Sequence, residues 1–510
     1  MRNSKSVFTR SKLLAGAAMA ACVLVGGTAS GETRLSIGIT SNLSTVNPYG
    51  DSAGHLYGLW GEVYGNLCRY SFKKGEYVPH LAAKWETTDK NTWVFHLKKG
   101  MKFHDGTALT AKDVVHSYSR MSNDPESSQK QNSKKKVKSV EAVDDHTVKM
   151  ITHKPTSSLL SYICGLWAIT SKDAYDKYGA KEADKNHPYG AGPYKLKEFV
   201  IGNRMVLEKD PKSPFAKSNG PDIVIVRKMA EAEQRVTALL NGEIQIAQFP
   251  PPHLLTRIEK AKNARLVPTS SVEIMFLAMN PGIKPWANKK LRQAVCHAIN
   301  REGIVKALLK GQAQILHGPI GPGQYAYDPN LQPRYAYDPA KAKKLVAEAG
   351  FPNGVEVDLY TPVGRYVNDK QITQAMVPML NAVGIKTKLH TPEWVTQWAN
   401  VRKGKRPFFY QGRGSVIDPG PALSQYFETG VSPRIKYSND QYDKLMQAER
   451  DAFDPKQRIA KLREAMSVLT EDAPACFMWT HTLHYAIANN VDFQPRPDGR
   501  PYLSEAIMKN

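Results

Sequence analysis

In the first half of the chain, hydrophobic and polar positions follow either the alternation typical of strands or the spacing typical of helices. The residues of 34–40 alternate, which predicts a first strand, and 54–69 place apolar residues at helical spacing. Further on, 222–228 predicts a strand, 230–240 a helix and 242–248 another strand. Alternating strands and helices of this kind indicate an α/β lobe.

The second half shows the same alternation after a strand at 272–279, which ends at Asn280-Pro281. Asp338 and Pro339 suit the cap and first position of a helix that ends at Gly350. The remaining expected elements are strands at 355–360 and 385–390, and helices at 288–309, 393–403, 441–453 and 456–469. The segment 475–487 should return the chain to the first lobe.

The stretch Phe408 to Phe427 combines a short apolar strand, a loop rich in glycine and proline, and the start of a helix. Its loop carries one cation, Arg413, and one anion, Asp418. A strand that leads through glycines into a helix is where α/β proteins place ligands. The alternative is a structural crossover whose charges are solvated, and this stretch alone does not decide between them.

The run from Trp93 to Arg120 predicts strands at 93–98 and 101–103, joined as a hairpin with turns at 98–100 and 105–106. A helix should follow, with Thr110 at its N-cap and Asp113 completing a capping box. His104 beside Asp105 could suggest acid–base chemistry, but adjacent residues at a turn favour a structural role.

Length and the N-terminus add two expectations. A chain of 510 residues exceeds one ordinary core, so two or more domains are expected. Basic residues precede an apolar segment at 13–25, and small residues suit cleavage after Gly31, as in a secretory signal. Cys22 leaves lipid attachment as a minor alternative. The later sequence has no apolar stretch long enough to span a membrane.

The formal charge of +23 raises the question of an anionic partner. The lysines are scattered apart from a run at 134–138, which lies among polar residues and indicates a solvated loop. This pattern, together with export, argues against nucleic acid. Cys68, Cys164, Cys296 and Cys476 lie far apart, and both disulfides and buried free thiols stay open.

The Trp93–Arg120 run resembles the solute-binding proteins of ABC importers, in the family that includes dipeptide-, oligopeptide- and nickel-binding members. Its Phe103-His104-Asp105-Gly106 and Thr110 to Val114 match the family pattern. Further matches occur downstream in the family's order, at 190–194, 280–301, 318–322 and 337–342. The resemblance covers essentially the whole chain after the signal.

This resemblance implies an α/β, two-lobed periplasmic binding protein of the large peptide-binding class, with a ligand cleft between the lobes. It divides the chain into a signal peptide at 1–31, lobe I at 32–274 and 481–510, and lobe II at 275–480, with an inserted subdomain at about 76–190. The expected function is an exported, monomeric receptor without enzymatic activity or cofactor. It would deliver a small ligand to the permease subunits of an ABC importer.

Family members that bind peptides use an Asp for the ligand amine and, in dipeptide binders, an Arg for the carboxylate. The Arg motif falls on Pro362 to Tyr366, which makes Arg365 the candidate anion anchor. The Asp position falls on Ser415, the family's Trp falls on Gly412, and Arg413 is added. The expected ligand-binding residues are Arg365, Tyr366, Trp394, Arg413, Gly414, Ser415, Asp418, Asn47, Tyr57 and Trp60.

These departures favour an anionic ligand. Peptides are the family's default, and acidic peptide-like, opine-like or sugar-conjugate solutes are the rival class. Asp418 suits a turn or helix cap, but a shift of three residues in the alignment would make it the amine anchor.

A metal receptor and a secreted hydrolase are two alternative functions. A receptor for nickel or a metal complex would need clustered ligands, yet His481 and His484 should lie on opposite faces of a strand. A secreted hydrolase is disfavoured, since the sequence has neither a Gly-x-Ser-x-Gly elbow nor a His-Glu-x-x-His motif.

Overall fold

The computed structural model describes residues 32–51, 54–414 and 417–509. The chain separates into Met1–Glu32 and Thr33–Asn510, and the second unit holds all the elements described below. The expected signal peptide, its cleavage site and Cys22 lie outside the described residues.

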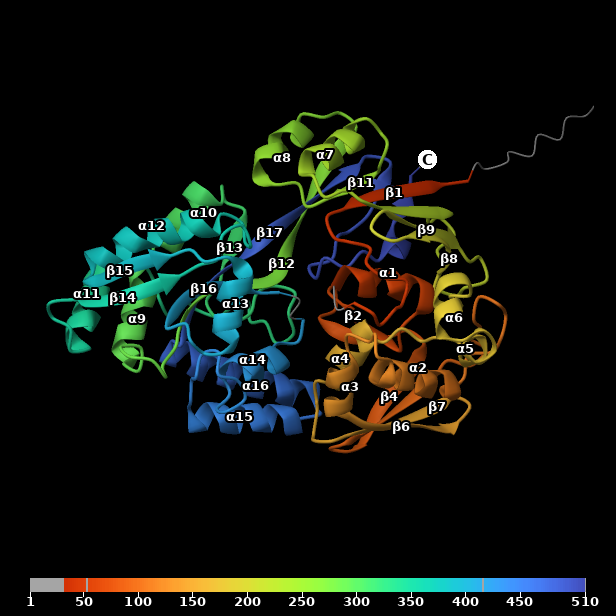
Figure 1. Ribbon diagram of the computed structural model, residues 1–510, viewed down its shortest axis with the longest axis horizontal. Coiled ribbons are helices and arrows are strands. Elements are labelled where there is room, and N and C mark those ends of the chain that lie inside the picture. The colour runs from red at the N-terminus through yellow and green to blue at the C-terminus, as the bar shows by residue number, and fades with distance from the viewer. Residues whose placement is uncertain (1–31, 52–53, 415–416, 510) are drawn as a thin grey trace, which may run out of the picture. The chain divides into compact units, whose positions relative to one another are not determined.

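Strands from both halves of the sequence share one mixed sheet (Figure 1). In the described residues its order is β15 (Ile385–His390), β14 (Val355–Tyr360), β16 (Phe408–Arg413), β12 (Ala264–Met279), β17 (Ala475–Ala488), β11 (Ile246–Gln248), β1 (Arg34–Ile39), β10 (Ile223–Lys228), β9 (Arg204–Lys209) and β8 (Tyr194–Val200), with β13 (Ala313–Ile315) also paired to β17. β14 runs parallel to both β15 and β16, and β1 runs parallel to both β10 and β11. This mixed α/β architecture is the fold class that the sequence predicts.

The long strands β12 and β17 lie side by side and join two groups of apolar clusters (Figure 1). Met275 and Leu277 of β12 pack with the core formed by the later part of the sequence, as do Met478 and Trp479 of β17. Farther along β17, Tyr485 packs with the core of the earlier part. The two strands therefore connect two cores, while the predicted lobe boundaries stay a prediction.

Smaller sheets and the helices complete the fold. A four-stranded antiparallel sheet has the order β4 (Ala82–Asp89), β5 (Thr92–Leu97), β7 (Thr147–Thr152) and β6 (Val137–Asp144). The pairs β2 (Cys68–Ser71) with β3 (Glu76–Pro79) and β18 (Val491–Asp492) with β19 (Ile507–Met508) form ribbons. The α-helices of the described residues are α1 (Gly54–Tyr64), α2 (Ala111–Asn123), α3 (Lys130–Lys136), α4 (Leu159–Leu166), α5 (Lys172–Tyr178), α6 (Ala180–Asn186), α7 (Ala232–Leu240), α8 (Pro252–Glu259), α9 (Lys289–Ala298), α10 (Arg301–Leu308), α11 (Pro339–Glu348), α12 (Asp369–Ala382), α13 (Trp394–Arg402), α14 (Pro419–Phe427), α15 (Asp440–Asp451) and α16 (Pro455–Asp472).

The start of α2 confirms the predicted capping box between Thr110 and Asp113. The backbone N–H of Thr110 donates to Oδ2 of Asp113 at 2.8 Å. His104 is structural: its ring contacts the backbone of Gly190 at 3.3 Å and of Gly192 at 3.2 Å. Burial lowers the pKa of His104 to about 4, so the ring is neutral near pH 7.

Three expected elements differ from the structure. The helix predicted over 54–69 ends at Tyr64, because Gly65 takes a left-handed φ of 74°. The helix predicted over 288–309 is two helices, since the Asn300 side chain accepts from the N–H of Gly303 and begins α10. The hairpin strand predicted at 101–103 is reduced to one bridge, and β5 pairs with β4 and β7 instead.

The four cysteines of the described residues form two disulfides. Cys68 of β2 is bonded to Cys164 of α4, and Cys296 of α9 is bonded to Cys476 of β17. The alternative of free thiols is therefore wrong. Each bond ties together segments far apart in the chain, with separations of 96 and 180 residues.

The double variant Cys296→Ser/Cys476→Ser should be less stable by roughly 2–4 kcal/mol, because the bond restricts the unfolded chain over a long loop. Urea unfolding of the oxidised parent and the variant measures the difference. With a reductant in both samples the parent and the variant should unfold at similar midpoints, and equal midpoints without a reductant would contradict the prediction.

Candidate functional site

The predicted ligand-binding residues of the later core gather where three neighbouring strands end. Because β15, β14 and β16 run in the same direction, their carboxyl ends meet at one edge of the sheet. The segments that follow β15 and β14 carry Trp394 and Arg365, and Arg413 is the last residue of β16. Ligands of α/β proteins bind at such carboxyl edges.

Arg365 lies on a loop that Asp369 holds in place. The carboxylate of Asp369, buried at the start of α12, accepts backbone N–H groups of Gly364, Arg365 and Tyr366 at 3.1, 2.9 and 3.0 Å. The Arg365 side chain is exposed. Its Cζ lies 4.9 Å from the ring centroid of Tyr366 and 5.1 Å from that of Trp394. A guanidinium resting on aromatic rings keeps its N–H edge free for a carboxylate.

Trp394 begins a series of rings and arginines that continues toward Arg413. The Trp394 ring is stacked on that of Trp398 at 5.6 Å. Cζ of Arg434 lies 5.4 Å from the Trp398 ring and 5.3 Å from the Tyr426 ring. Cζ of Arg413 lies 5.7 Å from the same tyrosine. We call this series the arginine–aromatic ladder; its members are Arg365, Trp394, Trp398, Arg434, Tyr426 and Arg413.

None of the three arginines of the ladder is in an ion pair among the described residues. Within the described ranges, Arg365, Arg413 and Arg434 each lack a carboxylate oxygen within the 4.0 Å that defines an ion pair. Burial lowers the pKa of Arg434, and the charges of Arg413 and Arg402 lower it further. Arg413 and Arg434 repel each other and, like Arg365, have no ion-pair partner in the described residues, so a bound anion would be stabilised beside them.

Glu273 lies on the Tyr366 side of this edge. It sits on β12 at an irregularity in the pairing between Ser270 and Ile274, and such bulges redirect side chains. A Cβ added to Gly412 would lie 3.1 Å from Oε1 of Glu273 and 2.7 Å from Cε1 of Tyr366. Glu273 and Tyr366 therefore occupy the space that a larger residue at position 412 would need.

Arg413 points to the other face of β16. It pairs with Ile274, and directly opposite residues share a face of the sheet. With Ile274, Tyr426 and Phe477 it lines a small, mostly apolar cavity of about 30 Å³. Its buried Nε has no hydrogen-bond partner among the described residues. The ladder thus passes around the end of β16, with Arg365 on one face and Arg413 on the other.

Asp418 is a helix cap. Its Oδ1 accepts the backbone N–H of Gly420 at 3.1 Å at the start of α14. The guanidinium of Arg458 donates to both of its oxygens, at 2.7 and 2.8 Å, and also to Glu449. All three side chains are buried, at 6% exposure or less. The carboxylate is already paired, which disfavours the amine-anchor role.

Ser415, the position expected to replace the amine anchor, lies outside the described residues. Gly414 is described, and a Cβ there would lie 3.4 Å from Oε1 of Glu273.

Asn47, Tyr57 and Trp60 belong to the earlier part of the chain. Asn47 is buried and donates to Oδ2 of Asp124 at 3.2 Å, and the hydroxyl of Tyr57 accepts from Gln129 at 2.8 Å. Trp60 is 1% exposed and stacks on Phe199 at 5.4 Å. These residues do not join the group at the carboxyl edge. Trp60 instead packs in the core of the earlier part of the chain.

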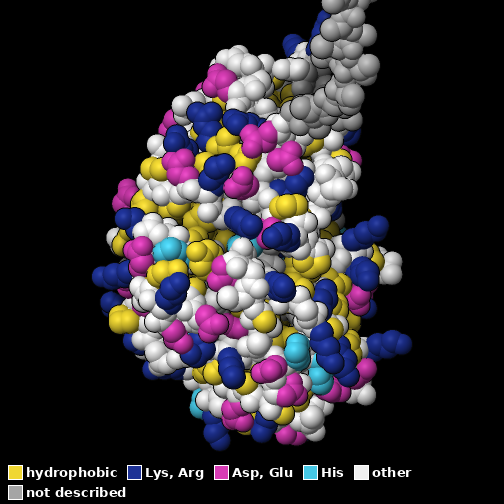
Figure 2. Space-filling view, turned by 90° about the vertical axis from the view of Figure 1, so that its right-hand side faces the viewer, with side chains coloured by type: hydrophobic (Ala, Val, Ile, Leu, Met, Phe, Trp, Pro, Cys, Tyr) yellow, Lys and Arg dark blue, Asp and Glu magenta, His cyan; other side chains and the backbone are white. Residues whose placement is uncertain are grey.

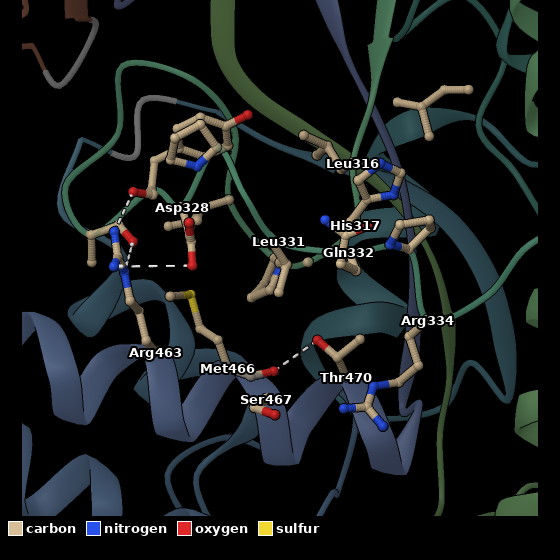
Figure 3. A pocket seen from close by; sticks show the side chains of 18 residues that line it. Leu316, His317, Asp328, Leu331, Gln332, Arg334, Arg463, Met466, Ser467 and Thr470 are labelled. Carbon is tan, nitrogen blue, oxygen red and sulfur yellow. Dashed lines mark hydrogen bonds and ion pairs between the residues drawn. The ribbon is translucent and has the colours of Figure 1, made fainter.

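A separate cavity of about 370 Å³ lies between α16 and the segment 315–334 (Figure 3). Its wall is largely apolar, with Leu331 and Met466 facing the same space. Arg463 at one end is bound to the backbone oxygens of Ala326 and Tyr327. The cavity contains none of the ligand-binding residues that the sequence predicts.

The visible surface carries charges of both signs. On the part of the face visible in Figure 2, Lys and Arg side chains are interspersed with Asp and Glu, which is typical of a solvated surface. In the described ranges no helix is long and apolar enough to cross a membrane, and no group of three His, Cys, Asp or Glu side chains could hold a metal ion.

Comparison with known proteins fits this architecture. Residues 76–433 match the family described as Bacterial extracellular solute-binding proteins, family 5 Middle. The chain belongs to this family. Its members are binding proteins, and the chain is accordingly a ligand-binding receptor of the ABC-importer type.

Individual relatives agree over nearly the full length. A dipeptide-binding protein of Escherichia coli is 28% identical over 481 residues, covering 88% of this chain and 88% of the relative. A glutathione-binding protein of Salmonella choleraesuis is 28% identical over 491 residues, covering 93% and 94%. The structure of HbpA2 from Haemophilus parasuis superposes with a TM-score of 0.86 at 23% identity, covering 94% of this chain and 100% of that one.

Sequence reasoning missed five residues of the site: Glu273, Asp369, Trp398, Tyr426 and Arg434. Asp369 could have been found, since it begins a helix directly after the Arg365 loop, where a carboxylate suits free N–H groups. Trp398 was visible four residues after Trp394. Glu273 and Arg434 gave no local signal, because only the sheet register and the folded chain bring them to the edge.

Proposed function

We propose that the protein is an exported receptor for an acidic, peptide-like solute, which it binds at the carboxyl edge of β14–β16 and delivers to the permease subunits of an ABC importer. The observation that carries this proposal is the arginine–aromatic ladder, whose three arginines have no carboxylate partner in the described residues. Arg365 binds the ligand carboxylate as a planar fork, and Trp394 and Tyr366 hold that fork in position.

The relatives support a peptide-like ligand. Those already described bind dipeptides and glutathione by their names, and glutathione is an acidic peptide with two carboxylates. Opine-like and sugar-conjugate acids share the negative charge and stay within the proposed class. The proposal also includes cleavage near Gly31, action as a monomer in the periplasm, and the absence of catalysis, cofactor and nucleic acid.

Isothermal titration with three probes tests the ligand class: the acidic dipeptide Ala-Glu, glutathione, and the neutral dipeptide Met-Leu. We expect at least one acidic probe to bind about tenfold more tightly than Met-Leu, the scale of one added charge-assisted hydrogen bond. Equal or tighter binding of Met-Leu would refute the acidic preference. Native mass spectrometry of protein purified from its own periplasm would weigh the natural ligand.

A further inference from the structure

Glu273 is a carboxylate without a partner beside the proposed anion site. It is half-buried, and in the described residues its side chain makes neither a hydrogen bond nor an ion pair. Burial raises the pKa of Glu273, and the positive charge of Arg365 opposes this effect. A half-buried carboxylate without a partner is costly to the fold, so its presence calls for a function.

Two glycines at the end of β16 lie beside Glu273. Gly412 and Gly414 present no side chains, and their added Cβ atoms would approach Oε1 of Glu273 to 3.1 and 3.4 Å. Tyr410, which alternation places on the same face as these glycines, is fully buried. Its hydroxyl has no partner in the part of the chain that the structure describes. Tyr410 lies close enough to Glu273 for the carboxylate's charge to raise the pKa of its hydroxyl, after the larger effect of burial.

Opposite charges lie on the two sides of Tyr366. Arg365, with Tyr366 and Trp394, supplies the positive side, and Glu273 supplies the negative side. Tyr366 lies between them: its hydroxyl donates to the backbone oxygen of Gly412 at 3.2 Å, and the charge of Glu273 contributes to raising its pKa after the larger effect of burial. An anion-binding arginine and an unpaired carboxylate on the same face suit a zwitterion.

We infer that Glu273 binds the protonated amine of the ligand, so that the receptor selects acidic peptides with a free amino group. The carboxylate would accept N–H groups of the ligand's ammonium while Arg365 holds a ligand carboxylate. This inference deepens the proposed function and rests on it for the position of the ligand. It gives the amine an anchor on β12, whereas the sequence places the family's amine anchor at Ser415.

Glu273→Gln tests the inference, because it keeps the size of the side chain and removes the charge. Isothermal titration compares Ala-Glu with N-acetyl-Ala-Glu on the parent and the variant. The parent should bind the free amine about tenfold more tightly, as a charge-assisted hydrogen bond implies. The variant should bind the two forms within about twofold of each other, since the amine has lost its charge-assisted partner. A variant that keeps the parent's preference would overturn the inference.

Two controls make the result specific. Glu356→Gln, an exposed glutamate on β14, should keep the parent's preference. Unliganded Glu273→Gln should melt at or above the temperature of the parent, because it removes an unpaired, half-buried charge; a clear loss of stability would instead indicate a structural role and overturn the inference.

The titrations distinguish a failure of the proposed acidic preference from a failure of the role inferred for Glu273. If the parent binds Met-Leu at least as tightly as Ala-Glu, the acidic preference is wrong, and Met-Leu against N-acetyl-Met-Leu then gives the same comparison for Glu273. Loss of that amine preference in Glu273→Gln supports the inference, and its retention overturns it.

Discussion

Arg458→Ala should lower the free energy of unfolding by about 3–5 kcal/mol, because it leaves buried carboxylates without their counter-charge. Arg458 of α16 donates to both oxygens of Asp418 and to Oε1 of Glu449. The side chains of the arginine and the two acids are 6%, 1% and 2% exposed. Burial raises the pKa of Glu449, while Arg458 opposes that rise, so removing the arginine favours protonation of the acid.

Urea unfolding followed by circular dichroism measures this loss. Lys461→Ala is the matched control on α16, where an exposed pair with Glu464 should contribute well under about 1 kcal/mol. Adding Asp418→Asn and Glu449→Gln to Arg458→Ala should restore part of the stability, since the uncompensated charges are removed. A loss below about 1 kcal/mol for Arg458→Ala would show that this ion-pair cluster is not the stabilising contact we infer.

Much of the second half of the fold could be predicted from hydrophobic period and caps. The strands at 355–360 and 385–390 agree with β14 and β15, and Asp338 caps α11 as expected. These elements combine a clear period with a strong local signal at their ends. The helices predicted over 54–69 and 288–309 are wrong in extent, for a different reason. At Gly65 and at Asn300 a single backbone turn interrupts an apolar pattern that continues past it.

The candidate site was only partly predictable for a related physical reason. Arg365 and Trp394 follow strands, so their position at the carboxyl edge of the sheet can be predicted from the sequence alone. Whether Arg413 shares their face depends on the register of β12 with β16, which no local pattern contains. Glu273 depends on the same register and on an irregularity in the pairing, and the disulfides depend on contacts 96 and 180 residues apart.

Asp418 illustrates how a burial environment decides between two roles that the sequence leaves open. A carboxylate before Pro419 suits both a cap and an amine anchor. Arg458 lies forty residues later and occupies both of its oxygens, so Asp418 has little capacity left for a ligand. The acceptor for an amine must then come from elsewhere, and Glu273 is a carboxylate beside Gly412 and Gly414 that forms no hydrogen bond or ion pair with the residues the structure describes.

Arg365→Ala should weaken binding of Ala-Glu by about tenfold to a hundredfold, the range for losing charge-assisted hydrogen bonds to a carboxylate. Arg365→Lys should fall between the parent and the alanine variant, because lysine keeps the charge but lacks the planar fork that rests on Tyr366 and Trp394. The exposed side chain makes no ion pair in the described ranges, so the melting temperature should barely change.

Isothermal titration at low and high salt measures the effect, and affinity of the parent should fall as salt screens the exposed cation. Arg257→Ala, an exposed arginine on α8 that pairs with Glu233, is the matched control and should bind Ala-Glu like the parent. An unchanged dissociation constant for Arg365→Ala would move the carboxylate site to Arg413 and Arg434 on the other face of β16. The corresponding alanine variants at those two positions would then show the loss.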